Sequence, residues 1–315
     1  MTRYCVQIRP LSPFASAMTG GMLFGHVAWS VREAFGEARL TALLDGYCAG
    51  RPFAVLSDAF PHDFVPVPVI PAHIWRQAET AKERKRLKTL KWLAVDALHT
   101  SPTRWQNEAR DNAGVSAAQG SPFVREVWCT HNSISRLTGT TGEGPFAPYG
   151  VSVNAFAREQ LLDLYVDLDE ERLSADEFED LLKSVGSFGF GRDASTGAGK
   201  FDVEAMEKRP DNDASRGWLA LCASAPSGSG FDGERSFYRP LTYFGRHGNV
   251  RANEGTPFKK PIVLADTGAF FWCDEPRAMQ WTGKGISGHS AYADAVHQGY
   301  APLLPVRELQ QENFE

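Results

Sequence analysis

The sequence predicts an α+β fold in two modules, residues 1–209 and 210–315. First, the apolar periodicity of residues 1–209 gives the order strand, helix, strand, strand, helix, strand once a large insertion at about 50–148 is set aside. This βαββαβ order is that of a ferredoxin-like sheet with two helices on one face. Second, residues 210–315 are rich in strand patterns, which suggests another ferredoxin-like module. Third, a chain of 315 residues, 43% of them hydrophobic, is long enough for two domains.

The first module opens with a strand and a helix. Tyr4, Val6 and Ile8 recur at every second position, which predicts a strand. A mostly apolar segment from Gly21 to Phe35 predicts a buried helix. Its N-terminus lies in a Ser/Thr/Gly-rich turn, and such a terminus can hold a phosphate. A short helix and an extended segment are then predicted at 40–47 and 53–60.

The insertion carries a basic segment at 76–91, which looks helical and continues to residue 95. Seven positive and two negative charges fall within it. Such a run is either a solvated helical face or an arm that contacts RNA. In the second case the contact residues are Arg84, Lys85, Arg86 and Lys88.

The rest of the insertion contains few regular elements. Prolines recur too often from 61 to 71 for regular structure, and 101–121 reads as a mobile polar connection. A strand is predicted at 124–136 within the insertion, and two more are predicted after it, at 149–156 and 160–168.

The most informative segment runs from Gly186 to Phe201. It follows a helix whose start has capping-box spacing at Ser174 and Glu177, and it contains five glycines, three hydroxyls and two cations. Glycines allow positive φ and close backbone approach, so consecutive N–H groups can surround a phosphate while the cations add charge. The alternative is a flexible turn between the helix and the next strand.

Two nucleotide-binding motifs are excluded at this loop. Gly189 to Ala194 matches the dinucleotide pattern by letters, but that motif must follow a strand and open a helix, and here the order is reversed. A phosphate loop of the Walker A type fails because Phe201 follows Lys200.

Composition excludes further classes. A net charge of −5 argues against indiscriminate nucleic-acid binding. The five cysteines are dispersed and odd in number, and the histidines lack metalloprotease spacing, so we expect no disulfide framework, no metal and no cofactor. No apolar run of about 18 residues and no signal peptide are visible, so we expect no membrane segment and a cytoplasmic location.

Four blocks, in order over nearly the whole chain, carry a resemblance to a known family. They are Gly21 to His26, Leu56 to Pro61, His131 to Gly139 and Phe190 to Phe201. In these blocks the chain resembles the RAMP superfamily of CRISPR proteins, most closely the crRNA 5′-handle-binding subunit of the type III-A (Csm) effector complex. Asp193 departs from the family's more basic loop and favours backbone N–H contacts over a purely electrostatic grip.

The resemblance implies two ferredoxin-like folds, a protruding thumb at about 62–130 and a role without catalysis. Such a subunit holds the 5′ handle of crRNA in antiviral defence. Its partners are the large polymerase-type subunit and the RAMP backbone subunit of the Csm complex, and it meets target RNA indirectly.

The candidate RNA-binding residues come from the first helix, the segment after residue 130 and the glycine-rich loop. They are Ser16, Thr19, Gly21, His26, His131, Asn132, Ser133, Arg136, Gly189, Phe190, Gly191, Arg192, Ser195, Thr196, Gly197, Gly199 and Lys200. Aromatic side chains can stack on bases if they are exposed. The candidates, each of which can instead belong to the core, are Trp105, Tyr149, Phe188 and Phe190.

A metal-independent endoribonuclease that cleaves pre-crRNA is the rival hypothesis. Related RAMP proteins use a histidine as general acid or base, and such chemistry needs a base near the 2′-OH. His26 is the first candidate and His131 the second. The alternative for His26 is a satisfied histidine on a buried helix.

Overall fold

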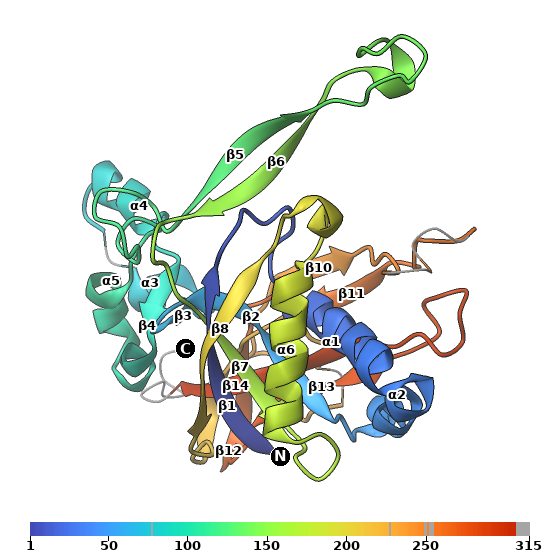
Figure 1. The fold of residues 1–315 in the computed structure, drawn as a ribbon. Coiled ribbons are helices and arrows are strands. Elements are labelled where there is room, and N and C mark those ends of the chain that lie inside the picture. The colour runs from blue at the N-terminus through green and yellow to red at the C-terminus, as the bar shows by residue number, and fades with distance from the viewer. Residues whose placement is uncertain (77, 227, 249–250, 252–254, 307–315) are drawn as a thin grey trace.

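The central sheet contains four antiparallel strands in the order β2–β7–β1–β8 (Figure 1). This computed structural model describes residues 1–315 except 77, 227, 249–250, 252–254 and 307–315. The strand–helix–strand–strand–helix–strand order predicted for 1–209 is observed in the strands of this sheet and the helices α1 and α6. Their bounds, with that of the short helix α2, are β1 Thr2–Pro10, α1 Gly20–Phe35, α2 Glu37–Leu44, β2 Ala54–Pro61, β7 Leu162–Leu168, α6 Ala175–Phe188 and β8 Phe201–Arg209.

Alternation along the strands gives this sheet two different faces. Tyr4, Val6 and Ile8 lie in one core cluster with apolar residues of α1 and α6. Cys5 and Tyr165 point to the opposite face and belong to a second cluster, which includes residues of the insertion and of the C-terminal part. The sheet is therefore covered on both sides.

Helix α6 leads directly into the glycine-rich loop. The predicted capping box is confirmed, because Ser174 Oγ accepts from the Glu177 N–H at 3.2 Å and the Glu177 carboxylate accepts from the Ser174 N–H at 3.0 Å. The predicted end at Gly186 is wrong, since the helix continues to Phe188 and Gly189 follows it at φ +103°. Gly186 instead allows close packing, because a Cβ there would lie 2.2 Å from the carbonyl oxygen of Phe201.

Residues 62–110 fold as a small lobe against the second face of the sheet. The helix predicted over 76–95 is shorter than expected, because α4 covers only seven residues and the segment after it pairs with β3. The supposed connection at 101–121 contains Trp105, which is fully buried and donates to Ala97 O at 3.0 Å. The elements of this lobe are β3 Phe64–Pro66, α3 Ala72–Trp75, α4 Ala81–Leu87, β4 Trp92–Ala94, η2 Val95–His99, η3 Pro102–Arg104 and α5 Trp105–Glu108.

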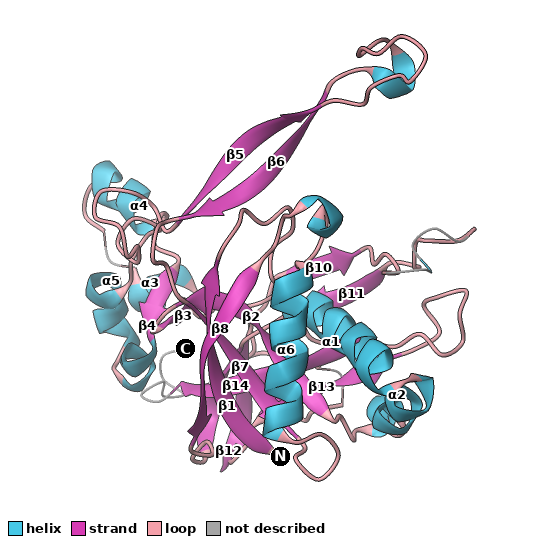
Figure 2. Cartoon of the chain, viewed as in Figure 1, coloured by secondary structure: helices cyan, strands magenta, loops and turns pink. Residues whose placement is uncertain are grey.

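A long hairpin formed by β5 (Val124–His131) and β6 (Tyr149–Phe156) projects away from the body (Figure 2). Its tip contains the short turn η4 (Gly144–Phe146). We expected a thumb at about 62–130. The projecting hairpin begins near the end of that region, at residue 124, and continues beyond it to residue 156. Periodicity could not place it, because strands of a free hairpin and of a buried sheet have the same local pattern.

The C-terminal part is built from strands, and its described residues contain no α-helix. One sheet has the order β12–β9–β14–β13, and β10 pairs with β11. The two helices that a second βαββαβ module needs are therefore not seen within the described residues of 210–315. Strand β13 contains Gly283 and Gly285, and glycine is rare in strands, so the local pattern at 281–286 does not predict a strand. The bounds are β9 Ser215–Ala220, β10 Pro240–Tyr243, β11 Ile262–Ala265, β12 Phe270–Arg277, β13 Trp281–Ile286 and β14 His297–Val306.

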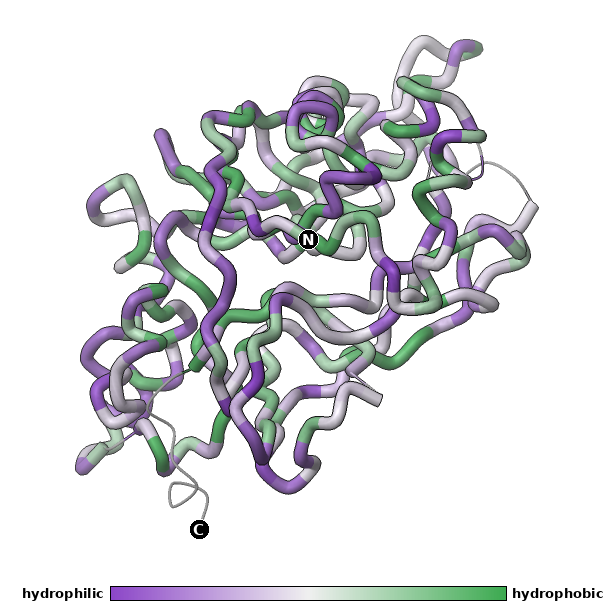
Figure 3. The backbone as a smooth tube through the Cα atoms, turned by 90° about the horizontal axis from the view of Figure 1, so that it is seen from below, coloured by the Kyte–Doolittle hydropathy of each residue, from purple (hydrophilic) through white to green (hydrophobic). Residues whose placement is uncertain are grey.

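Direct hydrogen bonds join the C-terminal part to the central sheet. The Gln298 side chain accepts from Leu56 N at 3.0 Å and donates to Leu56 O at 2.7 Å. The N–H of Asp58 donates to Leu221 O at 2.9 Å. Hydrophobic and hydrophilic stretches are interspersed along the described backbone (Figure 3). Within the described ranges, no helix combines the length and apolar character needed to cross a bilayer.

Candidate nucleic-acid interface

The connection from α6 to β8 has a backbone that depends on glycine. Gly189, Gly191, Gly197 and Gly199 have φ between +74° and +103°, and Asp193 also has positive φ at +63°. This left-handed region is costly for residues with a Cβ. The prediction of a loop with unusual backbone geometry is confirmed.

The segment after β1 fixes the shape of this loop. Pro13 O accepts from Gly199 N at 2.9 Å, Ser12 Oγ accepts from Lys200 N at 2.9 Å, and Ser16 Oγ accepts from Arg192 N at 3.1 Å. These contacts join residues more than 170 positions apart in the sequence. The loop is therefore anchored rather than a free turn.

His26 supports the loop from helix α1. Its Nε2 accepts a hydrogen bond from Gly191 N at 3.1 Å, and its ring lies 4.8 Å from the ring of Phe190. Burial lowers the pKa of His26 to about 4, so the imidazole is neutral at physiological pH. The nitrogen that would take a proton from a 2′-OH is thus occupied by the protein backbone.

The loop leaves few N–H groups for a ligand. The N–H groups of Thr196 and Ala198 donate to Asp193 O, and that of Gly197 donates to Ala194 O at 3.0 Å. Among the hydrogen bonds of the described residues, none uses the N–H groups of Asp193, Ala194 or Ser195. A phosphate would therefore meet this short stretch rather than the whole loop.

Arg192 connects the loop to the projecting hairpin. Its Nη2 donates to Ser152 O of β6 at 3.1 Å, and its Nε lies 3.3 Å from Asp193 Oδ2. Lys200, at the other end of the loop, is exposed. The two cations predicted to serve a phosphate therefore differ, because Arg192 also bonds to the middle of β6 in the hairpin.

The N-terminus of α1 does not offer the phosphate site that the sequence suggested. Asp58 Oδ1 accepts from Gly20 N at 2.8 Å, so a carboxylate of the protein already occupies this helix end. The Thr19 side chain makes no capping bond. Gly21 lies against His297, because a Cβ there would be 2.9 Å from that ring.

The remaining predicted residues lie in two other places. His131 is at the outer end of β5, where its ring stacks on Tyr149 at 5.5 Å, and Asn132, Ser133 and Arg136 follow at the tip of the hairpin (Figure 1). The basic side chains of α4 are exposed on the lobe. The structure thus does not gather all predicted residues into one site.

Two of the four aromatic candidates are wrong as base-stacking platforms. Phe190 and Trp105 are fully buried, and a ring without exposed faces cannot stack on a base. Phe188 is 72% exposed beside the glycine-rich loop, and Tyr149 is 53% exposed on the hairpin. These two remain available.

A cleft of about 1060 Å³ lies beside the loop. Its walls are α1, the loop from Phe188 to Ser195, and two C-terminal segments at 243–248 and 294–297. Sequence reasoning missed its C-terminal residues, among them Phe244 and Lys259. Nothing local links them to the glycine-rich loop, since they are about 50 positions or more away in the sequence.

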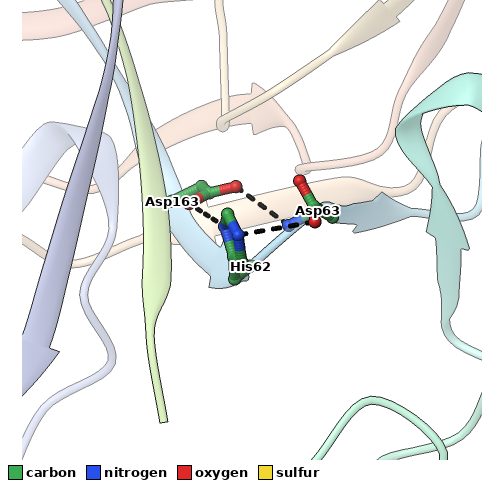
Figure 4. Close-up of side chains that lie close together, drawn as sticks. All are labelled: His62, Asp63 and Asp163. Carbon is green, nitrogen blue, oxygen red and sulfur yellow. Dashed lines mark hydrogen bonds and ion pairs between the residues drawn. The ribbon is translucent and has the colours of Figure 1, made fainter. Parts of the chain in front are cut away.

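One further cluster of polar side chains lies on the opposite face of the sheet (Figure 4). Potential ligand atoms of His62, Asp63 and Asp163 lie within 4.8 Å of one another. Both Asp163 oxygens already accept hydrogen bonds, from His62 Nδ1 at 2.8 Å and from Asp63 N at 2.9 Å. Burial raises the pKa of Asp163, and these bonds oppose that shift. The cluster joins the turn after β2 to β7.

Acid is expected to destabilise the protein through His26. Its pKa is about 4 in the folded chain and about 6.5 when unfolded, so the unfolded chain binds the extra proton between these values. Stability present above pH 6.5 is therefore lost as the pH falls, by about 3 kcal/mol at pH 4. Urea unfolding at several pH values measures this loss.

The variant His26→Gln isolates this contribution. Glutamine does not titrate, and its side-chain oxygen can accept the Gly191 N–H. The variant should lose less stability than the natural protein between pH 6.5 and 4. An identical pH dependence would show that His26 is not the responsible group.

Solved structures of CRISPR assemblies share this fold. A chain of the Csm1–Csm4 cassette in complex with AMPPNP matches with a TM-score of 0.59 and 14% identity, covering 98% of this chain and all of that one. A chain of the Csm3–Csm4 subcomplex of the type III-A CRISPR-Cas interference complex matches with a TM-score of 0.59 and 12% identity, covering 97% and 99%. A chain of the type III-B Cmr-beta complex bound to cognate target RNA and AMPPnP has a TM-score of 0.50 and 13% identity, covering 85% and 86%.

The protein therefore has the fold of a type III CRISPR effector subunit. Csm4 is the component common to the cassette and the subcomplex, which agrees with the family that the sequence resembles. No protein-family profile matches the chain, and no curated protein sequence matches it. At such low identity the likeness is one of fold, so binding and assembly are inferences from the site.

Proposed function

We propose that this protein is the subunit of a type III-A (Csm) CRISPR effector complex that holds the 5′ handle of crRNA. The observation that carries the proposal is the anchored glycine-rich loop beside a cleft, within a fold that matches Csm4-containing structures over nearly the whole chain. The unused N–H groups at 193–195, together with the hydroxyls and cations at 192–200, suit a phosphate backbone. The protein acts in antiviral defence in the cytoplasm.

The proposed role is structural rather than catalytic. His26 supports the loop and is neutral, and His131 stacks on Tyr149 at the end of the hairpin. Neither arrangement resembles a general base beside a proton donor. The subunit joins the large polymerase-type subunit to the first RAMP backbone subunit, and it meets target RNA only through that assembly.

Ferredoxin-like modules remain part of the proposal. For residues 1–209 the support is the strand order β2–β7–β1–β8 with α1 and α6 in the core of one face. For residues 210–315 the support is limited to the antiparallel sheet β12–β9–β14–β13. The projecting hairpin serves as the thumb, and the basic face of α4 is a further candidate for RNA contact.

The direct test is to purify the tagged chain from cells that express its genomic neighbours and to sequence the retained RNA. We expect RNA with one uniform 5′ end. Lys200→Ala should reduce the retained RNA and flatten the dependence of affinity on salt by about 0.7 per lost phosphate contact. Lys208→Ala is the matched control, because it removes an exposed lysine from the far end of β8.

Two outcomes would overturn the proposal. One is purification of the assembled complex without RNA or with RNA of random ends. The other is cleavage of repeat RNA at one defined position by the purified chain, abolished by His26→Ala, which would instead establish the endoribonuclease.

A further inference from the structure

The C-terminal wall of the cleft contains a lysine without a carboxylate partner. Lys259 lines the cleft, and no aspartate or glutamate among the described residues lies within 4.0 Å of its amine. Burial, and then the charge of Arg251, lower the pKa of Lys259. A charge removed from water without a partner is costly, so an anion at this position would be stabilising.

Two histidines lie near Lys259. His297 lines the cleft and is buried, and burial followed by the charge of Lys259 lowers its pKa to about 3. His289 lies beside it, with ring centroids 6.0 Å apart. Burial, and then the charge of Lys259, also lower the pKa of His289. Both imidazoles are neutral near pH 7, and each has ring nitrogens that can donate or accept hydrogen bonds.

The carboxylates around the cleft already have partners. Asp294 accepts two bonds from Arg251, at 2.8 and 3.1 Å. Glu37 pairs with Arg32 at 3.2 Å. The acidic side chains at the rim thus do not compensate Lys259.

Exposed aromatic rings line the same cleft as Lys259. Phe244 is 70% exposed and lines the cleft next to Tyr243, whose ring stacks on His297 at 4.9 Å. Phe188, also exposed, lines the cleft from the side of the glycine-rich loop. A concave site with a cation and accessible aromatic faces has the chemistry of single-strand nucleic-acid recognition.

We propose that this cleft binds a single-stranded segment of RNA, with a phosphate at Lys259 and a base stacked on Phe244. The inference rests on the proposed function and extends it from the glycine-rich loop to the C-terminal part of the chain. RNA fits better than a protein surface, because the site is a concave cleft that contains a lysine without a carboxylate partner among the described residues, rather than a flat apolar patch. The two walls then clamp one strand between them.

The test measures binding of a fluorescein-labelled oligouridine RNA of about 12 nucleotides, a length within the known footprints of single-strand-binding folds. Phe244→Ala should weaken binding about tenfold or more through lost stacking. Lys259→Ala should weaken it and lower the salt slope by about 0.7. Phe258→Ala and Lys260→Ala are matched controls, because each removes an exposed neighbouring side chain of the same type outside the cleft. They should change binding less than twofold.

Site-specific crosslinking gives a second readout that does not depend on variant stability. The same RNA with 4-thiouridine should crosslink to the peptide containing Phe244. The measurements are made on the full chain and repeated on the purified complex, where retained crRNA is counted.

Each outcome separates this inference from the proposed function. If Lys200→Ala weakens RNA binding while Phe244→Ala and Lys259→Ala do not, the cleft proposal is wrong and the handle-binding function stands. If neither the chain nor its complex binds RNA, the cleft proposal and the handle-binding function are both wrong. If Phe244→Ala leaves RNA binding unchanged but releases a protein subunit from the complex, the cleft is a protein-docking surface instead.

Discussion

Replacing Arg3 by alanine is expected to lower the free energy of unfolding by about 3–5 kcal/mol. The Arg3 side chain is only 2% exposed and makes a bidentate pair with Asp167, at 2.8 and 2.7 Å. It also donates to Leu303 O at 2.6 Å and to Gln280 O at 2.5 Å. The variant leaves the Asp167 carboxylate buried without its counter-charge, which explains the size of the loss.

Arg9→Ala provides the control on the same strand. Arg9 also contacts two carboxylates, Glu204 at 2.6 Å and Asp202 at 3.2 Å, but its side chain is 38% exposed. Such surface pairs contribute about 0–1 kcal/mol. Urea unfolding of both variants measures the difference, and equal losses would contradict the importance that we assign to burial.

Gly199→Ala is expected to cost about 2–4 kcal/mol, more than Gly197→Ala in the same loop. A Cβ on Gly199 would lie 2.1 Å from Phe190 O and 2.6 Å from Phe190 N, at φ +74°. At Gly197 the corresponding space is open, so only the backbone strain at φ +99° remains, about 1 kcal/mol. Thermal unfolding of the two variants checks this order.

The same pair of variants separates two roles of the loop. Gly197 is exposed, so an added methyl group there meets only a bound ligand. We expect Gly197→Ala to stay folded and to retain less crRNA in the purified complex. Full RNA occupancy with a slightly lowered melting temperature would mean that Gly197 serves the turn alone. Gly199→Ala cannot answer this question, because its methyl group disrupts the loop first.

Local sequence patterns were sufficient for most of the first module. The alternation of Tyr4, Val6 and Ile8, the capping box at Ser174 and the positive-φ glycines are each determined by neighbouring residues, so they can be recognised without the fold. The strand-rich character of the C-terminal part was recognised in the same way, although β13 was not. Gly285 shows where local patterns fail. In the fold it permits close packing on Tyr47, but in the sequence alone a glycine argues against a strand.

The candidate site could be predicted only in part. The glycine-rich loop is recognised by its composition, and Ser16 and His26 were already among the candidate residues, although not as anchors of the loop. The cleft residues Phe244 and Lys259 come from distant segments and were not predicted. Which segments meet depends on the packing of the whole sheet, and one sequence does not carry that information locally. The burial of Phe190 was likewise not decided by its neighbours, since a loop aromatic can point either way.

The contacts of Arg3 bear on how the protein is made. Leu303 lies 300 positions after Arg3, so the carbonyl group that completes this buried cluster is synthesised long after Arg3 itself. A nascent chain leaving the ribosome can form the Arg3–Asp167 pair once β7 has emerged, but it cannot cover that pair until β14 follows. Chains generally fold domain by domain during synthesis, and contacts between such distant residues are slow to form. The N-terminal half must therefore wait, partly exposed, until β14 has been synthesised.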